Sequence, residues 1–353
     1  MENKSPLVQI RGRGAAENPP NRFEPIEYVP DPDAYDPDEP LPRTMLFKDA
    51  TRQILARNNS PDVGFDVSIN PYRGCEHGCI YCYARPTHEY FGLSAGLDFE
   101  TKIFVKLDAP RLLRAEFMKK SWKPQVVMIS GVTDCYQPAE RKLKITRGLL
   151  EVFAEFRNPI ALITKNHLVT RDLDLLGDLA RDNLARVSVS ITSLRNDIQH
   201  VMEPRTSIPA RRLAAVAALA KAGVPVNVMV APIVPGLTDE ETPTILRAVA
   251  EAGATSAGYV MLRLPFAVKD LFEAWLERNF PERKDKVLNR IRSLRDGQLY
   301  QSKWGTRMRG DGIFADQIEA LFDTTCRKLG LNLDRSPLST EHFRRPGEQL
   351  ALL

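Results

Sequence analysis

From Gly64 onward, short apolar runs rich in β-branched residues alternate with longer segments of helical periodicity. The six runs are FDVSI, VVMIS, IALIT, RVSVSIT, VNVMV and GYVML, ending near Ile69, Ser130, Thr164, Thr192, Val230 and Leu262. This alternation is typical of parallel β/α units. Six units are too few to close an eight-stranded barrel, so we predict an α/β fold with an open, partial (β/α)6 barrel.

Two of the predicted helices carry recognisable start signals. Thr238 and Glu241 have the spacing of a capping box, and Pro209 stands where the first helical turn tolerates proline. After Pro265 the pattern is mostly helical, with a glycine-rich break at WGTRMRGDGI and an amphipathic helix near 316–329. The helices predicted between the strands span roughly 110–122, 140–156, 170–183, 209–222 and 238–252.

The pattern divides the chain into four segments. Residues 1–46 are rich in proline and acidic residues and lack periodicity, which predicts an extended or disordered arm, with an arm docked on the barrel as the alternative. Residues 47–265 form the predicted barrel. Residues 266–335 form a helical extension, and 336–353 a polar tail.

Charge and hydropathy narrow the class of protein only slightly. The 49 Lys and Arg against 45 Asp and Glu give a net charge of +4, which permits an anionic partner without requiring one. The N-terminal sequence lacks the apolar stretch of a signal peptide, and no run reaches the length of a membrane span. We therefore expect a cytoplasmic protein that does not enter the membrane. The oligomeric state stays open.

Three of the five cysteines lie in one short segment, NPYRGCEHGCIYCYARP, directly after the first predicted strand. Cys75, Cys79 and Cys82 have the spacing CxxxCxxC within a loop at 71–86. Three thiolates can hold three irons of a cubane cluster, which leaves the fourth iron free to bind a cofactor or substrate. A zinc site with His77 as the fourth ligand is the alternative.

CxxxCxxC with an aromatic residue, here Tyr81, before the last cysteine resembles the signature of the radical S-adenosylmethionine (SAM) superfamily, whose core is a partial (β/α)6 barrel. The resemblance implies a [4Fe-4S] cluster and SAM as cofactors, and an electron donor such as flavodoxin or ferredoxin. In that superfamily the open iron binds the amino and carboxylate groups of SAM. Reductive cleavage then gives methionine and a 5′-deoxyadenosyl radical that abstracts hydrogen from the substrate.

Polar residues at the carboxyl ends of the strands are the natural candidates for binding the cofactor. Asp134 is matched to the superfamily's acidic motif, which binds the methionyl ammonium group, and Lys165 or Arg205 would neutralise the cofactor carboxylate. Hydroxyl groups near the fourth strand would bond the ribose. Strand hydroxyls that merely satisfy nearby backbone groups are the alternative. The candidates are Tyr81, Ser130, Gly131, Thr133, Asp134, Lys165, Ser190, Thr192, Glu203 and Arg205.

Within the superfamily, residues 65–310 resemble spore photoproduct lyase and its lyase-like relatives. The similar segments are TKNHLVTRDLDLL, VSVSIT, MEPRTSIPARRLAAVAALAKAGVPVNVMVAPI and the KWG at Lys303–Gly305. The founding activity of that family reverses a thymine lesion in DNA.

The match is incomplete at one functional position. The lyase has a hydrogen-donating cysteine three residues before its acidic residue, where this chain has Gly131. Cys135 lies on the other side of Asp134, and an ordinary buried thiol is its alternative role. Tyr81 and Tyr83 match tyrosines implicated in hydrogen transfer. The predicted catalytic residues are therefore Tyr81, Tyr83 and Cys135.

Three functions follow. A radical SAM enzyme acting on a DNA lesion or other nucleic acid predicts a basic surface near the barrel mouth. A radical SAM enzyme acting on a peptide or small molecule predicts an enclosed mouth. An iron–sulfur binding or electron-transfer protein would hold the cluster without turnover. The basic candidates for the first function are Arg205, Arg263, Lys303, Arg307 and Arg309.

Overall fold

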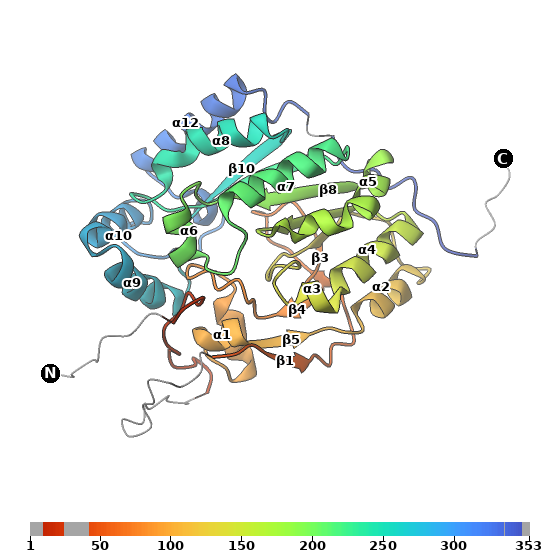
Figure 1. Cartoon of the computed structure of the whole chain (residues 1–353), viewed down its shortest axis with the longest axis horizontal. Helices are drawn as coiled ribbons and strands as arrows, with labels where there is room; N and C mark the ends of the chain where they lie inside the picture. The colour runs from red at the N-terminus through yellow and green to blue at the C-terminus, as the bar shows by residue number, and fades with distance from the viewer. Residues whose placement is uncertain (1–9, 25–41, 335, 348–353) are drawn as a thin grey trace.

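The computed structural model describes residues 10–24, 42–334 and 336–347, and a seven-stranded sheet lies at its centre (Figure 1). Its six parallel strands stand side by side in chain order, which confirms the predicted partial (β/α)6 barrel. The short strand β2 pairs antiparallel with β3 at one edge. The strands are β2 (Ala56–Arg57), β3 (Val67–Ile69), β6 (Val127–Ile129), β7 (Ile160–Thr164), β8 (Ala185–Ser190), β9 (Val226–Ile233) and β10 (Ser256–Met261).

Helices between consecutive strands cover one face of this sheet (Figure 1), as expected when every crossover between neighbouring parallel strands has the same hand. Pro209 is the first residue of its helix, as predicted. These helices are α2 (Ala109–Phe117), α3 (Glu140–Leu143), α4 (Ile145–Phe156), α5 (Leu173–Arg181), α6 (Asn196–Met202), α7 (Pro209–Lys221) and α8 (Thr242–Glu251). Short 3-10 helices are η2 (Arg85–Phe91), η3 (His167–Asp172) and η4 (Asp239–Glu241).

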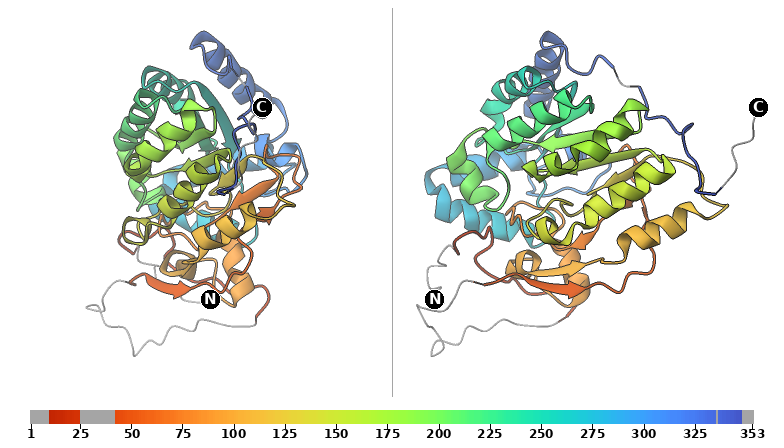
Figure 2. Two further views of the ribbon diagram at one scale, coloured as in Figure 1. Left: turned by 90° about the vertical axis from the view of Figure 1, so that its right-hand side faces the viewer. Right: turned by 45° about the vertical axis from the view of Figure 1, so that its right-hand side comes forward.

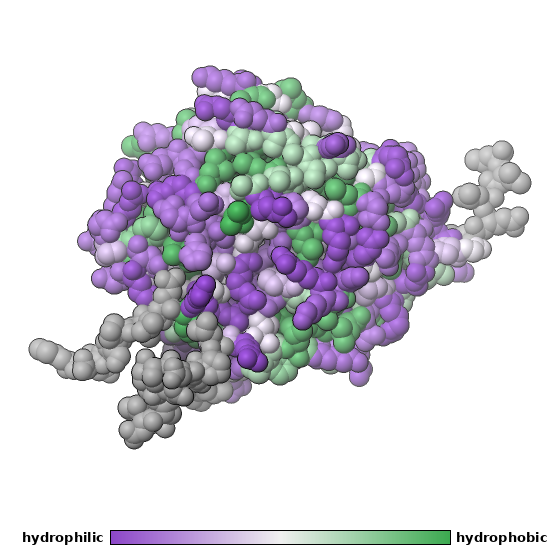
Figure 3. Space-filling view, viewed as in Figure 1, coloured by the Kyte–Doolittle hydropathy of each residue, from purple (hydrophilic) through white to green (hydrophobic). Residues whose placement is uncertain are grey.

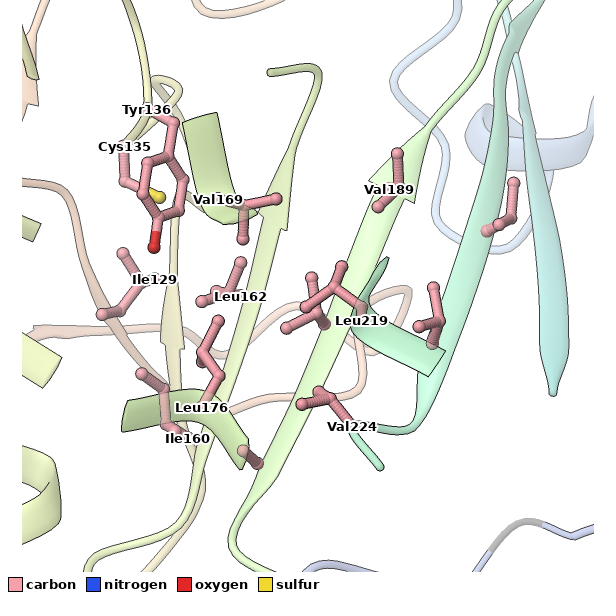
Figure 4. Close-up of a cluster of buried hydrophobic side chains, with 14 of the residues drawn as sticks. Ile129, Cys135, Tyr136, Ile160, Leu162, Val169, Leu176, Val189, Leu219 and Val224 are labelled. Carbon is pink, nitrogen blue, oxygen red and sulfur yellow. The ribbon is translucent and has the colours of Figure 1, made fainter. Parts of the chain in front are cut away.

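Apolar side chains from strands and helices form the main core (Figure 4). Buried and partly exposed residues alternate along β7, so one face of the strand packs against the helices. Figure 4 places Ile129, Leu162 and Val189 of successive strands together with Leu176 of α5 and Leu219 of α7. Polar residues cover most of the molecular face shown in Figure 3.

The predicted capping box is wrong. The Thr238 hydroxyl accepts a hydrogen bond from Val234 N–H at 3.0 Å, four residues back in the chain. The Glu241 carboxylate accepts one from Leu194 N–H at 2.8 Å, in the loop after β8. Thr238 therefore fastens the loop after β9, Glu241 fastens the loop after β8, and α8 begins only after η4.

A second, three-stranded sheet lies beside the barrel and was not predicted (Figure 2). Its strands are β1 (Met45–Lys48), β5 (Lys102–Val105) and β4 (Tyr72–Arg73), with the short helix α1 (Leu97–Thr101) preceding β5. β1 pairs parallel with β5, whereas β4 pairs antiparallel with it. Because β4 lies inside the cysteine loop, this sheet anchors that loop to the protein.

Residues 10–24 are docked, which corrects the prediction of a disordered arm for this part and matches the docking alternative. Arg13 is 5% exposed and donates a hydrogen bond to the Glu100 carbonyl at 2.8 Å. Residues 1–9 and 25–41 lie outside the described part of the chain.

After β10 the chain is mainly helical, as predicted. Trp275 and Phe272 of α9 pack with α10 in a second apolar cluster, which also contains Ile80 and Tyr81 of the cysteine loop. The helical extension therefore packs directly against that loop. Its elements are α9 (Val268–Asn279), η5 (Pro281–Arg283), α10 (Lys284–Ser293), α11 (Thr306–Arg309) and α12 (Ile313–Lys328).

The end of the helical extension and the described part of the polar tail run along the opposite end of the barrel. Asn332 N–H donates to Thr255 O at 3.1 Å, and Ser339 N–H donates to Asn183 O at 2.9 Å. Thr255 and Asn183 precede β10 and β8, so these contacts lie at the amino ends of the strands. Among the residues that the structure describes, none of the helices is both long and apolar enough to cross a membrane.

Candidate functional site

The cysteine loop follows β3 at the carboxyl end of the sheet. All three cysteines are unpaired thiols: Cys75 and Cys79 are buried and Cys82 is half-buried. Burial is the largest influence on each thiol and raises the pKa of all three. The positive charge of bound iron would reverse this preference and hold the groups as thiolates, so the donor set fits a metal cluster.

The surroundings of the loop disfavour the zinc alternative. His77 Nδ1 lies 3.4 Å from Asp134 Oδ2, and its Nε2 lies 3.2 Å from Asn166 Nδ2, so both ring nitrogens have protein partners. Within the described ranges, no three His, Cys, Asp or Glu side chains gather around a single point as a mononuclear metal ion requires. The thiols of a cubane cluster bind three different irons and need not converge in this way.

A buried ion pair holds the loop in shape. Arg85 is fully buried, donates hydrogen bonds to the Cys79 and Gly96 carbonyls at 3.0 Å each, and pairs with Glu100 at 2.5 Å. The Glu100 carboxylate also accepts hydrogen bonds from Gly14 N–H and Ala15 N–H of the N-terminal segment. The sequence analysis missed this pair.

Close backbone packing explains two glycines of this region. Gly74 has a positive φ of 78°, and a Cβ there would lie 2.9 Å from the Phe99 carbonyl oxygen. A Cβ at Gly14 would lie only 1.9 Å from the Gly78 carbonyl oxygen. The N-terminal segment thus touches the cysteine loop backbone to backbone.

Asp134 connects the loop after β6 to the end of β7. Its carboxylate accepts hydrogen bonds from the Thr164 hydroxyl and the Lys165 N–H, each at 2.7 Å. Burial opposes ionisation, but His77 and these hydrogen bonds outweigh it, so the pKa of Asp134 is lowered. Both oxygens already have intramolecular partners, which makes Asp134 a structural centre of the site.

Glu203 is the centre of a second polar network. It is 1% exposed, pairs with Arg212, and accepts hydrogen bonds from the hydroxyls of Tyr81 and Thr192, the latter at 2.7 Å. Burial opposes its ionisation, but Arg212, Lys165 and these hydrogen bonds lower the pKa of Glu203 to about 2. The sequence analysis singled out Glu203 but not Arg212, its counterion.

Lys165 brings a positive charge beside the cysteine loop. Its Nζ donates to the Ser190 hydroxyl at 2.7 Å and lies 5.9 Å from the centre of the Tyr81 ring. The Ser190 hydroxyl donates to the Ala231 carbonyl at 3.0 Å, and the Thr192 hydroxyl oxygen, whose proton goes to Glu203, lies 3.0 Å from the same carbonyl oxygen. Ser190 therefore satisfies a local backbone group, the alternative that the sequence left open.

The loop after β6 is fastened to the cysteine loop. Thr133 donates to the Tyr72 carbonyl at 2.8 Å, and the exposed Tyr83 hydroxyl donates to the Gly131 carbonyl at 2.5 Å. Ser130 has a positive φ of 75°, and its hydroxyl accepts a hydrogen bond from Cys135 N–H at 2.6 Å. Most predicted residues of this loop thus lie together at the barrel mouth.

Cys135 is the exception. It is 0% exposed and lies in the main apolar core beside Tyr136 (Figure 4). Burial raises its pKa well above the ordinary value of a thiol. This placement is typical of an ordinary buried thiol, the alternative that the sequence left open, and the catalytic role of Cys135 stays a prediction.

The predicted basic surface is largely neutralised. Arg205 pairs with Glu76 at 3.3 Å, Arg307 with Asp62 at 2.5 Å, and Arg309 with Glu319. Of the predicted cations, Arg263 and Lys303 form no ion pair with a described residue. A further arginine near the mouth, Arg22, was not predicted; it stacks on Phe266 at 3.7 Å and pairs with Glu89 at 2.7 Å.

An open (β/α)6 barrel with a three-cysteine loop at the carboxyl ends of its strands defines a class of α/β enzymes built to hold a cluster at the barrel mouth. The chain belongs to the radical SAM superfamily, whose family model matches residues 69–249, half of the chain. The chain is therefore an enzyme of this superfamily.

Similar proteins are known in bacteria and archaea. An uncharacterized protein of Mycobacterium bovis is 36% identical over 252 residues, covering 71% of this chain and 72% of that protein. One of Methanocaldococcus jannaschii is 27% identical over 227 residues, covering 64% and 81%. Spore photoproduct lyase complexed with dinucleoside spore photoproduct has the same fold, with a TM-score of 0.55 and 18% identity over 81% of this chain and 80% of that chain.

Proposed function

We propose that Cys75, Cys79 and Cys82 hold a [4Fe-4S] cluster whose open iron binds SAM, and that the enzyme abstracts hydrogen from a nucleic acid. Family membership and the buried, loop-borne thiols support the first part. When bound, these cofactors supply a 5′-deoxyadenosyl radical by reductive cleavage of SAM. The protein's own residues must position the cofactors and exclude water.

Each polar network has a distinct part in this account. The Arg85–Glu100 pair fixes the backbone of the cysteine loop before any cluster binds. Lys165, beside Tyr81, is the cation we assign to the cofactor carboxylate. Glu203, kept ionised by Arg212, orients the Tyr81 hydroxyl, so the ring stands in one position next to the cofactor.

A set of exposed aromatic rings near the mouth is the observation that favours a nucleic acid substrate. Tyr83 is 47% exposed, and Phe266 and Trp304 are each 51% exposed. Each ring has an arginine against it, at 5.5, 3.7 and 4.0 Å respectively. Exposed rings with adjacent cations are the usual platform for stacking single-stranded bases, at about 1–3 kcal/mol per base.

The experiment reconstitutes the cluster anaerobically, adds reductant and SAM, and supplies single-stranded oligodeoxynucleotides deuterated on their sugars and bases. We expect the strand to increase 5′-deoxyadenosine formation and to transfer deuterium into it. Trp304→Ala should weaken binding of the strand by about tenfold, because one stacking platform is lost. Leu321→Ala, an exposed apolar change on α12, serves as the control.

Two outcomes oppose the proposal. If a peptide or small molecule labels 5′-deoxyadenosine and nucleic acid does not, the chemistry stands and the substrate class is wrong. If cluster and SAM bind but no 5′-deoxyadenosine forms under any condition, the chain is a binding or electron-transfer protein.

A further inference from the structure

Two arginines at the carboxyl end of β10, the buried Arg295 and the half-buried Arg263, form no ion pair with a described residue. Arg295 is 1% exposed, and its Nη2 donates to the Leu262 carbonyl at 2.8 Å. Its Nη1 is buried and has no hydrogen-bond partner in the described part of the chain. One N–H-bearing nitrogen of this guanidinium is therefore left without an acceptor among the described residues.

Arg263 is the second cation. Within the described part of the chain, its one hydrogen bond runs from Nη1 to the Met308 sulfur at 3.3 Å, and a thioether is a weak acceptor. Its Nε is buried and lacks a partner among the described residues. The guanidinium lies 5.5 Å from the ring centre of Tyr83, which follows Cys82 directly in the chain. The pair of arginines is thus next to the cysteine loop.

Arg85 and Arg212, which are buried as fully as Arg295, show what is missing here. Arg85 pairs with Glu100, and Arg212 pairs with Glu203. Neither Arg263 nor Arg295 has a carboxylate within 4.0 Å among the described residues. An unpaired buried charge beside a second charge of the same sign is costly, so the local fold alone does not account for Arg295 next to Arg263.

The neighbouring groups do not supply the missing charge. The charge of Arg263 acts on the Asp62 carboxylate, but the two oxygens of Asp62 already accept hydrogen bonds from Arg307 and from Gly305 N–H. Burial, reinforced by Arg263 and opposed by Tyr300, lowers the pKa of Arg295 to about 10. Arg295 therefore still carries its charge at neutral pH.

We propose that Arg263 and Arg295 together bind a phosphate oxyanion of the substrate, beside the exposed ring of Tyr83. Guanidinium groups match the planar geometry of phosphate oxygens. A phosphodiester of a strand and the terminal phosphate of a free nucleotide share this chemistry. The strand is favoured by the neighbouring rings, an argument that rests on the proposed function.

The test measures binding of a labelled single-stranded oligodeoxynucleotide to the full-length, cluster-loaded protein by fluorescence anisotropy at several salt concentrations. Arg295→Met and Arg263→Met should each weaken binding about tenfold. Each should also reduce the slope of log affinity against log salt by about 0.7. Arg181→Met, on the exposed end of α5, is the matched control and should change neither quantity.

A neutral analogue separates charge from folding. A short strand with one methylphosphonate linkage should bind the wild type more weakly than its phosphodiester parent, and Arg263→Met should lose this discrimination. Competition by a free nucleotide, dependent on both arginines, would assign the site to a terminal phosphate.

Unchanged affinity and salt slope in both folded variants would overturn the site. SAM cleavage stimulated by nucleic acid would then leave the proposed function intact. Failure of any strand to bind the wild type would reject both the site and the nucleic acid substrate.

Discussion

At the scale of single residues, the candidate site depends on charges buried in pairs. Glu203 is held as an anion between Arg212 and two hydroxyl groups, and Glu100 between Arg85 and two backbone N–H groups. Such pairs contribute little net stability, but removing one partner leaves the other charge uncompensated. Their main effect is to fix the geometry around Tyr81 and the cysteine loop.

Arg212→Met should therefore destabilise the protein strongly. The Glu203 carboxylate would keep its burial and lose its counterion, which costs about 3–5 kcal/mol. The neighbouring Arg211 is exposed, so Arg211→Met is the matched control and should change stability little. Chemical denaturation of both variants measures the difference. Equal midpoints would show that the pair does not support the fold.

His88 should make stability depend on pH. It is 0% exposed, and burial lowers its pKa to about 4 from an ordinary 6.5. Between these values the unfolded chain binds a proton that the folded protein does not, so stability should fall as pH drops from 6.5 to 4. The full loss is roughly 3 kcal/mol.

The measurement compares unfolding midpoints at pH 7.5 and 5 for wild type, His88→Met and, as the control, His342→Gln, whose side chain is 47% exposed. His88→Met should flatten the pH dependence, and His342→Gln should leave it unchanged. An equally steep pH dependence in His88→Met would assign the effect to other groups.

Sequence reasoning at this scale found residues whose spacing carries information and missed those whose partners are distant in the chain. The cysteine triplet and Tyr81 were recognisable because a motif fixes their separation. Arg85, Arg212 and Arg295 look like surface arginines in the sequence, since their burial depends on contacts made only in the fold. Cys135 follows Asp134 directly in the chain, but its side chain lies in the apolar core whereas the Asp134 carboxylate bonds Thr164, a difference that spacing in the sequence does not reveal.

At the scale of elements, all six core strands were predictable because buried parallel strands are apolar and β-branched along their whole length. The strands of the second sheet lack this pattern of buried residues: all four residues of β1 are exposed, and β4 has only two residues. Thr238 and Glu241 had the spacing of a cap, but their side chains found tertiary partners instead. The arm at 10–24 lacks an apolar face and docks through polar contacts.

That docking gives a prediction for Gly14→Ala. The added Cβ would meet the Gly78 carbonyl oxygen at 1.9 Å, so the N-terminal segment should detach and leave the Glu100 carboxylate without two donors. Trypsin should then cleave the segment several-fold faster, and the cluster should bleach faster in air. Gly64→Ala meets nothing within 4 Å and is the control. Identical cleavage and bleaching in both variants would contradict the assigned contact.

At the scale of the whole molecule, different segments of the chain pack against the two ends of the barrel. The N-terminal segment and α9–α10 pack around the cysteine loop at the carboxyl ends of the strands, and the described tail packs at the amino ends (Figures 1 and 2). This arrangement leaves the exposed rings and the Arg263–Arg295 pair beside the mouth. A polymeric anionic substrate could reach that side without entering a closed cavity.

The most direct test of the central claim is the yield of 5′-deoxyadenosine from the anaerobically reconstituted protein with SAM and reductant, compared between wild type and Cys79→Ala. The account predicts 5′-deoxyadenosine from the wild type and none above background from the variant, because two thiolates cannot hold the cubane cluster in the required form. Equal yields from both proteins, or no product from a wild type that holds both cluster and SAM, would contradict it.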